Sequence, residues 1–492
     1  MKVLLVYPRF PETFWSFKYA LKLTMFKKAT HPPLGLLTVA SMLPEEWEKK
    51  LVDMNVRRLR DKDIEWADMV FISAMYVQRS SAEEVISRCK RLGVRVVAGG
   101  PLFTHCYNEF DQVDHLVLNE GEITLPPFLE DLERGCAEHI YKSDGWADME
   151  RSPTPLWGLV DMNRYVSASV QYSRGCPFNC DFCDITFLYG HKPRLKTSEQ
   201  IVAELDAIYS QGWRESVFFV DDNFIGNRKR LKQEVLPAIV SWQEERGYPF
   251  SFLTQASVDL VDDEDIMKMM VEAGFDTVFL GIETPDEESL KECKKYQNRG
   301  RDLVACVKKI QSFGMQVMGG FIVGFDNDTT SIFQRQIKFI QESGIVTAMV
   351  GILNVLRGTK LYNRLKGEKR LFREGTGDNT DCSVNFKPKM GIKPLIDGYR
   401  DMIKKLYSPD YYYERVKTFL RGFRPPKKLG HLRFCYLVAF LRSIVELGLR
   451  GRERLHYWKI FFWTLFTRPR LLPVAVTLSI QGFHFRRTFE RY

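Results

Sequence analysis

The chain has 492 residues, more than a single hydrophobic core usually serves, so two or three domains are expected. Hydrophobic residues make up 45% and charged residues 27%, a globular composition that excludes a disordered or fibrous protein. Ten cysteines are too few for a disulfide scaffold, and the start MKVLLVYPRF is too short and too soon interrupted for a signal peptide. A cytoplasmic, reducing location is therefore expected.

The charge of the chain is concentrated at one end. Residues 421–492 contain 15 Lys and Arg but only three Glu, a net charge of +12. The whole chain carries +9, which leaves about −3 for residues 1–420. The basic character therefore belongs to the C-terminal tail alone.

Residues 1–150 alternate between short apolar runs and helical patterns such as SSAEEVISRCKRLG. This alternation predicts an α/β domain with a doubly wound, Rossmann-like parallel sheet. Ligands of such sheets bind beyond the carboxyl ends of the strands, where the Gly99-Gly100 turn and Ser73 would allow a flat or phosphate-bearing ligand to approach closely. The alternative is that these glycines only close a tight turn. The expected strands are 2–8, 50–55, 69–75, 95–100 and 115–122.

A second alternating block follows the proline-rich linker 151–161. Helical patterns separate its strands, and the first helix starts at Thr197 with the Thr-x-x-Gln sequence of a capping box. Six β/α units predict a partial (β/α)6 barrel over residues 151–357, with its active site at the carboxyl ends of the strands. The expected strands are 168–173, 216–222, 250–257, 277–284, 316–325 and 348–356.

Three cysteines, Cys176, Cys180 and Cys183, follow the first barrel strand in SRGCPFNCDFC. A structural zinc site needs four ligands, and no second cysteine pair follows within about 50 residues. The proline, asparagine and aspartate between the cysteines are loop residues, which argues against cysteines buried only for packing. Thiolates hold iron–sulfur clusters, and a four-iron cluster with three protein ligands leaves one iron open to bind another molecule.

The CxxxCxxC spacing, with the aromatic Phe182 before the last cysteine, resembles the signature of the radical S-adenosylmethionine (SAM) family. The resemblance implies a [4Fe-4S] cluster on the three cysteines and SAM bound to the open iron through its amino and carboxylate groups. It also implies that an electron from the cluster cleaves SAM to a 5′-deoxyadenosyl radical. A zinc site or another redox site is the alternative.

Other strand ends of the barrel resemble the same family. GGFIVGF (319–325) is similar to the GxIxG motif of the fifth strand, where the backbone packs along the adenine. The carboxylate of GIET lies where the family places a polar group for the ribose or amino acid part of SAM, and polar residues also end the second and third strands. The alternative for each is an ordinary turn residue. SAM contacts are thus expected from Phe182, Asp222, Gln255, Glu283, Gly320, Ile322 and Gly324.

Beside such a barrel, residues 1–150 resemble the cobalamin-binding domain of the cobalamin-dependent radical SAM class. Members that ligate cobalt from below carry Asp-x-His-x-x-Gly after a strand, whereas Asp53-Met54-Asn55 lacks the histidine here. The resemblance implies cobalamin without a histidine lower ligand, and the alternative is a vestigial sheet that has lost cobalamin. Cobalamin contacts are expected from Asn55, Ser73, Gly99, Gly100 and Glu120.

The whole chain is most similar to the subgroup that contains hopanoid C-2 methylases and bacteriochlorophyll side-chain methylases, through segments such as VYPRFPETFWSF and VDDNFIGN. The resemblance implies methyl transfer from cobalamin to an unactivated carbon of a hydrophobic substrate, a polycyclic lipid or a tetrapyrrole. It also implies an electron donor such as flavodoxin or ferredoxin. No catalytic side chain is assigned beyond the cofactors. The alternative is a radical SAM enzyme for ring formation or carbon–carbon coupling, with a vestigial or substrate-binding N-terminal domain.

Residues 358–492 are expected to form a third, helical region. Its longest uncharged stretch, 471–485, has 15 residues and is too short and too interrupted to span a bilayer. One interpretation is a helical cap over the barrel mouth. The other is a basic amphipathic surface in peripheral contact with the inner face of an anionic membrane, and both can hold. Nucleic-acid binding is not expected, because the region is rich in aliphatic residues.

Overall fold

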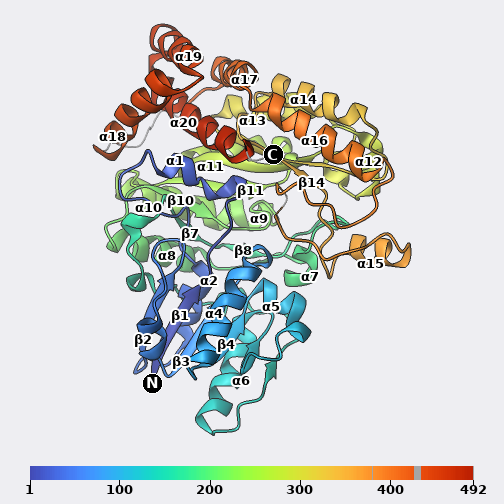
Figure 1. Ribbon diagram of the computed structural model, residues 1–492. Coiled ribbons are helices and arrows are strands. Elements are labelled where there is room, and N and C mark those ends of the chain that lie inside the picture. The colour runs from blue at the N-terminus through green and yellow to red at the C-terminus, as the bar shows by residue number, and fades with distance from the viewer. Residues whose placement is uncertain (379, 426–433, 491–492) are drawn as a thin grey trace.

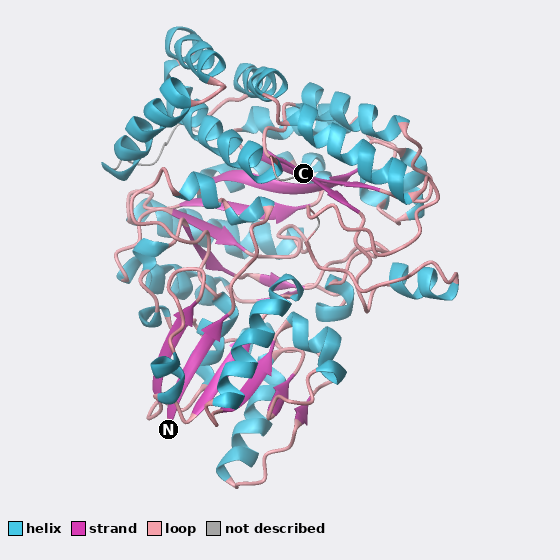
Figure 2. Ribbon diagram, in the orientation of Figure 1, coloured by secondary structure: helices cyan, strands magenta, loops and turns pink. Residues whose placement is uncertain are grey.

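The computed structural model describes residues 1–378, 380–425 and 434–490. An N-terminal sheet, a second sheet with the topology of a partial barrel and a set of C-terminal helices follow one another along the chain (Figure 1). Figure 2 shows helices packed along both sheets. The predicted α/β fold class is therefore confirmed.

The N-terminal sheet has six parallel strands in the order β2-β1-β3-β4-β5-β6. The order reverses at β1, as in doubly wound folds that bind ligands at that reversal. Runs such as KVLLVY and MVFIS are apolar throughout because helices cover both faces of the sheet. The strands are β1 Lys2–Tyr7, β2 Glu48–Asp53, β3 Met69–Ser73, β4 Arg95–Gly99, β5 His115–Val117 and β6 Ile140–Tyr141. The helices include α1 Lys18–Leu21, α2 Leu34–Met42, α3 Asp61–Glu65, α4 Arg79–Arg91, α5 Pro101–Cys106 and α6 Gly121–Glu133.

One strand prediction in this sheet was too long. Strand β5 ends at Val117, and the residues expected to continue it form a turn and the start of α6. Asn119 has a positive φ of 62°, and the hydroxyl of Thr124 donates a hydrogen bond back to the carbonyl of Leu118, so the chain reverses there. Strand β6, only two residues long, was not predicted.

The second sheet has six parallel strands in the order β7-β10-β11-β12-β13-β14, with β7 and β14 at its two edges. This confirms the six predicted β/α units. The capping box also forms, because Thr197 accepts a hydrogen bond from the Gln200 amide and the Gln200 side chain accepts one from the Thr197 amide. The strands are β7 Ser167–Val170, β10 Ser216–Phe219, β11 Ser251–Ala256, β12 Phe275–Glu283, β13 Gln316–Val323 and β14 Ala348–Ile352. The helices include α8 Ser198–Ser210, α10 Leu236–Glu245, α11 Glu264–Ala273, α12 Glu287–Glu292, α13 Leu303–Phe313 and α14 Ser331–Ser343.

The C-terminal region is helical, as predicted. Helices α16 and α17 pack on α14 of the barrel, and α20 packs on α1 near the other end of the chain. The uncharged stretch 471–485 lies mainly in α20, where Ala475, Leu478 and Phe485 are buried within the protein. None of the helices in the described part of the chain has the length and apolar character that crossing a membrane requires. The helices are α15 Lys360–Gly367, α16 Ile392–Leu406, α17 Pro409–Gly422, α18 Phe434–Ser443, the π-helix η10 Ile444–Arg450, α19 Arg454–Thr467 and α20 Leu472–Phe489.

Candidate active site between the two sheets

The three predicted cluster cysteines lie in a loop held by a small hairpin. Strands β8 (Ser173–Arg174) and β9 (Arg194–Leu195) pair antiparallel, and the cysteine loop, residues 175–184, leaves β8 and leads into α7 (Ile185–Tyr189). Gly175 begins the loop with a φ of +92°, and a Cβ atom there would lie 3.0–3.1 Å from three backbone carbonyl oxygens. Only glycine fits this position, so the hairpin fixes where the loop begins.

Burial raises the pKa of the three thiols, most strongly that of Cys183. The charge of Cys180 raises the pKa of Cys176, and the charges of both raise that of Cys183, so the three sulfurs lie within electrostatic reach of one another. A cluster binds the thiolate form and supplies the positive charge that buried thiolates lack. The three side chains therefore fit a cluster site.

A buried lysine that the sequence analysis did not identify lies beside these thiols. Burial acts to lower the pKa of Lys295, but the charges of Glu283, Cys180 and Cys183 outweigh it and raise that pKa. The amino group of Lys295 donates a hydrogen bond of 2.8 Å to the Glu283 carboxylate. Lys295 lies in the segment KKYQN, whose local pattern gives no indication of this contact.

Glu283, one of the predicted SAM residues, sits in a strained backbone position at the end of β12. Its φ is +64°, and the pairing of β12 with β13 shifts register there. Such positions persist where the surrounding structure enforces them, often at functional sites. In this backbone conformation the Glu283 carboxylate accepts the hydrogen bond from Lys295, beside the cysteine loop.

Asp222 and Phe182 connect the cysteine loop to the barrel. The carboxylate of Asp222 accepts a hydrogen bond of 2.8 Å from the Gly175 amide, and burial raises the pKa of Asp222 to about 6. The ring of Phe182 packs edge-on against Phe325, with 6.2 Å between ring centroids, directly after the GxIxG-like segment. Asp222 thus contacts the cysteine loop, and Phe182, which belongs to that loop, contacts the barrel.

The glycines of the GxIxG-like segment have defined neighbours. A Cβ atom on Gly320 would lie 2.8 Å from the Phe279 ring, and Gly324 has a φ of +108°. The Gly324 amide donates to the carboxylate of Asp328, a residue not identified from the sequence, and burial raises the pKa of Asp328 to about 6. Ile322 lies on the same strand, where its carbonyl accepts a hydrogen bond from Gln336.

Gln255 lies at the end of β11, as predicted, but the hydrogen bond found there is made by its backbone. Its carbonyl accepts a hydrogen bond of 2.9 Å from the amide of Phe224. The side chain is half-buried. A role of this side chain in SAM binding stays a prediction.

The carboxyl ends of the N-terminal strands place Ser73 beside Gly99, where β3 pairs with β4. A Cβ atom on Gly99 would lie 2.6 Å from the Val117 carbonyl oxygen, and one on Gly100 would lie 2.7 Å from the Ser73 hydroxyl. Packing against the protein itself therefore requires both glycines. Their contact with cobalamin stays a prediction.

Asn55 and Glu120 have protein partners at the positions where cobalamin contacts were predicted. The Asn55 amide group donates to the carbonyl of Pro8 and to Asp53, and its oxygen accepts from the Phe10 amide, so it joins the ends of β1 and β2. The buried hydroxyl of Tyr165 donates to the other carboxylate oxygen of Asp53 at 3.0 Å. These contacts account for an asparagine where the lower-ligand motif has histidine.

Glu120 and Glu122, at the start of α6, contact the hairpin that carries the cysteine loop. Arg174 lies 3.0 Å from Glu120 and 2.7 Å from Glu122, and Arg194 lies 2.8 Å from Glu120. All four side chains are at most 15% exposed. Burial acts to raise the pKa of Glu122, but the Arg174 guanidinium lowers it to about 2. These four charged side chains join the N-terminal sheet to the iron–sulfur cluster site.

A second contact between the two sheets is aromatic. His105 of α5 stacks on Phe187 of α7, with 5.0 Å between ring centroids, and its Nε2 lies 3.3 Å from the Asp184 carboxylate at the end of the cysteine loop. Three apolar side chains on the adjoining segments are exposed: Phe187 itself, Met75 in the turn after β3, and Trp146, which lies over Gly190. The segments that follow β4 and β5 therefore both contact the hairpin and the cysteine loop.

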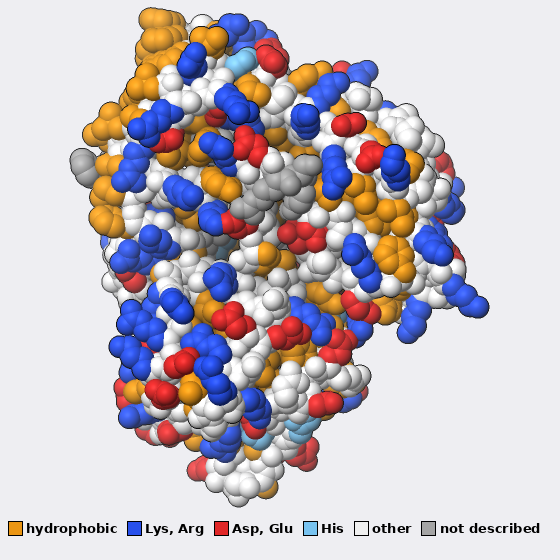
Figure 3. Space-filling model, viewed as in Figure 1, with side chains coloured by type: hydrophobic (Ala, Val, Ile, Leu, Met, Phe, Trp, Pro, Cys, Tyr) orange, Lys and Arg blue, Asp and Glu red, His pale blue; other side chains and the backbone are white. Residues whose placement is uncertain are grey.

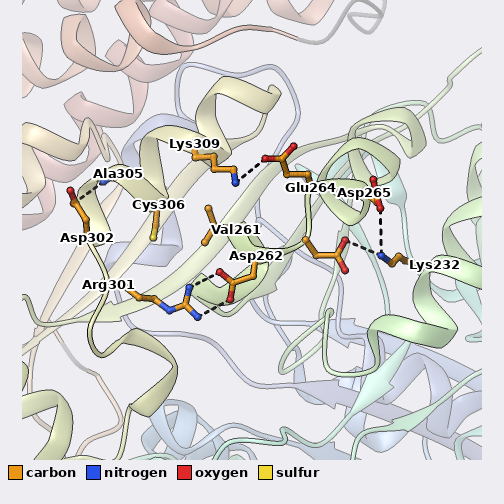
Figure 4. A pocket seen from close by; sticks show the side chains of 11 residues that line it. Lys232, Val261, Asp262, Glu264, Asp265, Arg301, Asp302, Ala305, Cys306 and Lys309 are labelled. Atoms are coloured by element: carbon orange, nitrogen blue, oxygen red, sulfur yellow. Dashed lines mark hydrogen bonds and ion pairs between the residues drawn. The ribbon is translucent and has the colours of Figure 1, made fainter.

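Two cavities lie away from these contacts. One, of about 830 Å³, is lined by ion pairs such as Arg301–Asp262 and Lys309–Glu264 on the outside of the barrel (Figure 4). The other, of about 860 Å³, lies between α1, α18 and α20. Neither contains a residue assigned to a cofactor, so neither is the candidate active site.

Comparison with known families agrees with this arrangement. Residues 27–129 match a B12 binding domain, residues 170–340 match the radical SAM superfamily, and residues 359–492 match a domain of unknown function, DUF4070. The chain is 43% identical to an uncharacterized methyltransferase, sll1242, of Synechocystis sp., over 99% of this chain and 91% of that protein. It is 34% identical to hopanoid C-2 methylase of Rhodopseudomonas palustris, over 93% of this chain and 88% of that protein.

The chain belongs to the cobalamin-dependent radical SAM methyltransferases. The enzyme therefore uses a [4Fe-4S] cluster, SAM and cobalamin, as predicted. Its fold is similar to that of the cobalamin-dependent SAM radical enzyme OxsB with aqua-cobalamin bound, with a TM-score of 0.63 and 15% identity over 100% of this chain and 80% of that one. Within the described residues, no three His, Cys, Asp or Glu side chains are arranged to hold a single metal ion. In a four-iron cluster each thiolate binds its own iron, so the three cysteines need not meet at one point.

Proposed function

We propose that the enzyme methylates an unactivated carbon of a hydrophobic, polycyclic substrate, a lipid or a tetrapyrrole. The observation that carries this proposal is the contact between the N-terminal sheet and the segment that carries the cysteine loop, where Met75, Trp146 and Phe187 of the adjoining segments expose apolar side chains. An apolar substrate bound there would lie between the cysteine loop and the strand ends of the B12-binding part. A hopanoid methylase among the relatives supports the same substrate class.

The cofactors supply the chemistry when bound: SAM on the cluster gives a radical that removes a hydrogen atom, and cobalamin gives the methyl group. The protein's own residues bind and orient these groups. In this proposal residues 1–150 hold cobalamin, residues 151–357 hold the cluster and SAM, and residues 358–492 close the barrel. Cys176, Cys180 and Cys183 bind the cluster, and Glu120, Glu122 and Arg174 keep the two cofactor regions aligned.

The remaining assignments rest on position at the strand ends. SAM is assigned to the barrel residues around the cysteine loop, and cobalamin to the residues beyond the N-terminal strands. A small electron-transfer protein such as flavodoxin or ferredoxin reduces the cluster. The proposed SAM residues are Phe182, Asp222, Gln255, Glu283, Gly320, Ile322 and Gly324, and the proposed cobalamin residues are Asn55, Ser73, Gly99, Gly100 and Glu120.

The test uses SAM that carries a deuterated methyl group. Anaerobically reconstituted enzyme is incubated with a polycyclic triterpene or with a tetrapyrrole, and mass spectrometry follows the substrate and 5′-deoxyadenosine. We expect one labelled methyl group per substrate and no product from Cys180→Ala. Deoxyadenosine and a changed substrate without added methyl would contradict methyl transfer and favour ring formation or carbon–carbon coupling.

A substrate that dissolves in lipid must be collected from a bilayer. Peripheral contact with the cytoplasmic face of an anionic membrane is therefore part of this proposal. The net charge of +12 over residues 421–492 supports it. Four of those basic residues, Lys427, Lys428, Arg433 and Arg491, lie outside the described residues.

A further inference from the structure

The helices α18, η10 and α19 carry a concentration of exposed apolar side chains. Of the 19 large hydrophobic side chains that are exposed in the described residues, eight lie within residues 436–466. Figure 3 shows hydrophobic side chains gathered along the upper left edge of the molecule, where Figure 1 places α18 and α19. Scattered exposed apolar residues are ordinary, but a contiguous group marks a contact site.

The exposed residues follow the helical period. Along α18 and η10 an apolar side chain is exposed at every fourth position, and α19 continues with spacings of seven and four. The opposite side of these segments already packs inside the protein, where Leu447, Tyr457 and Ile460 are buried and α19 contacts α17 and α20. We name the exposed side the apolar face; it consists of Leu437, Leu441, Val445, Leu449, Leu455, Phe462 and Phe466.

The charge around the apolar face is predominantly positive. Residues 436–470, all of which the structure describes, contain two carboxylates: Glu446, whose side chain is 37% exposed beside Arg450, and Glu453, which is buried beside Arg486. Two exposed carboxylates from elsewhere lie near this segment: Asp410, 3.5 Å from His456, and Glu490, which lines the same cavity as Leu441 and Val445. The exposed basic residues are Arg442, Arg450, Arg452, Arg454, Lys459 and Arg470.

This charge decides between possible partners. In a symmetric dimer a second copy would bring the same basic residues against the first, and the like charges would repel. An anionic lipid surface instead offers apolar chains below a layer of phosphate groups, which matches apolar residues flanked by Lys and Arg.

We propose that the apolar face enters the boundary between headgroups and acyl chains of one leaflet of an anionic membrane, with the six basic residues at the phosphates. The proposal goes beyond the proposed reaction, because it names the surface and the lipid partner whatever the substrate. Helix α20 has no part in the proposed contact, since its apolar residues Ala475, Val476, Leu478, Phe485 and Phe489 are buried and none of its large apolar residues is fully exposed. Trp458 is not counted in the apolar face either, because its indole N–H already donates a hydrogen bond to the carbonyl of Gly448.

The test is sedimentation of the full-length holoenzyme with vesicles of phosphatidylcholine and phosphatidylglycerol, compared with phosphatidylcholine alone. We expect binding to the anionic vesicles at about 0.1 M salt and release toward about 1 M, where the Debye length falls from about 10 Å to about 3 Å. The combined variant Leu449→Ser, Leu455→Ser and Phe466→Ser should weaken binding about tenfold or more. Phe372→Ser is the control, because Phe372 is exposed but lies outside this face.

A second variant tests the charges without touching the apolar residues. Replacing Arg454, Lys459 and Arg470 with Gln should weaken binding by about fivefold for each charge, or about 100-fold together. Deoxyadenosine formation in solution should be unchanged in every variant, which shows that the protein is folded and the cluster intact. Because sedimentation does not require turnover, its outcome is independent of methyl transfer.

Three results would overturn the proposal. The first is that the wild-type holoenzyme fails to sediment with anionic vesicles, or sediments equally with neutral ones. The second is that the serine and glutamine variants sediment as the wild type does, which would place the membrane contact elsewhere. The third is that light scattering shows a dimer for the wild type and a monomer for the serine variant, while neither binds vesicles. That result would make the apolar face an interface between two copies.

Discussion

Glu122 and Arg174 hold the N-terminal sheet against the loop that carries the cysteines. Two guanidinium nitrogens of Arg174 lie 2.7 and 2.8 Å from the two oxygens of Glu122, although 52 positions separate the residues in the sequence. This paired geometry is directional as well as strong, and both side chains are nearly buried. The ion pair is therefore one of the contacts that hold the N-terminal sheet to the hairpin carrying the cysteine loop.

We expect Glu122→Gln to lower the free energy of unfolding by about 2–3 kcal/mol, because a buried guanidinium loses part of its charge partner. Glu122 has a pKa lowered from 4.5 to about 2, so the wild-type advantage should be complete above pH 4.5 and lost as the pH falls through about 2. Urea denaturation of both proteins at several pH values measures this difference in the free energy of unfolding. Glu130→Gln on the same helix is the control; its side chain is 66% exposed and should change stability by less than about 0.5 kcal/mol.

His484 on α20 should make the docking of that helix sensitive to pH. Its Nδ1 accepts a hydrogen bond from the Tyr19 amide and its Nε2 lies 3.0 Å from the carbonyl of Phe14, so the neutral ring satisfies both contacts. Burial lowers the pKa of His484 from 6.5 to about 4. The unfolded chain therefore takes up the proton first, and stability is full above pH 6.5 and falls toward pH 4 by up to about 3 kcal/mol.

Urea denaturation of wild type and His484→Gln at pH 7 and at pH values toward 4 checks this. The stability difference between the two proteins should shrink as the pH falls. The exposed His139, changed to Gln, is the control and should follow the wild-type curve. Parallel curves for wild type and His484→Gln would contradict the assignment.

Gly100→Ala should weaken cobalamin binding at least about tenfold. Its φ of +89° disfavours any side chain, and the added Cβ would lie 2.7 Å from the Ser73 hydroxyl, so the Ser73 side chain must move. Gly93→Ala is a matched control, since Gly93 has a φ of +71° but nothing within 4 Å of the added atom. Optical titration with hydroxocobalamin measures both variants. Equal affinities would show that the Gly100 turn does not contribute to the cobalamin site.

Cys180→Ala should abolish the cluster and deoxyadenosine formation, because a three-ligand site has no thiolate to spare. Cys293→Ala is the control: this thiol is buried, and its residue is hydrogen-bonded through its carbonyl to the Asp181 amide, yet it lies outside the cysteine motif. Iron content and the anaerobic visible spectrum give the readout. A cluster that survives in Cys180→Ala and disappears in Cys293→Ala would reassign the ligands.

Local pattern was enough to predict most of the fold. The strands of both sheets are short apolar runs that end in turn residues, and this information lies within a few neighbouring positions. Strand β6 has only two residues and presents no periodicity. The error after β5 has a similar cause, since NEGE looks like a strand end in sequence but forms a helix start once Thr124 bonds back to Leu118.

The site was predictable only where a motif identifies it. Cys176, Cys180 and Cys183 have a diagnostic spacing, whereas Lys295 and Arg174 become informative only when folding brings distant carboxylates to them. The sequence analysis placed Glu120 at a strand end, whereas it lies at the start of α6, and it could not show that arginines of the hairpin pair with its carboxylate. In the tail, α19 is apolar on both sides, so periodicity could not tell the packed side from the exposed one.

The rings of Phe14 and Phe485 are stacked with 4.2 Å between their centroids, and His484 reaches the carbonyl of Phe14. This contact joins segments that are 470 positions apart in the sequence, so one is synthesised long before the other. On a ribosome that adds about 5–20 residues per second, the segment around Phe14 must wait roughly half a minute or longer for its partner. Until then its aromatic surface is uncovered, so the growing chain passes through a stage in which chaperone binding or aggregation competes with folding.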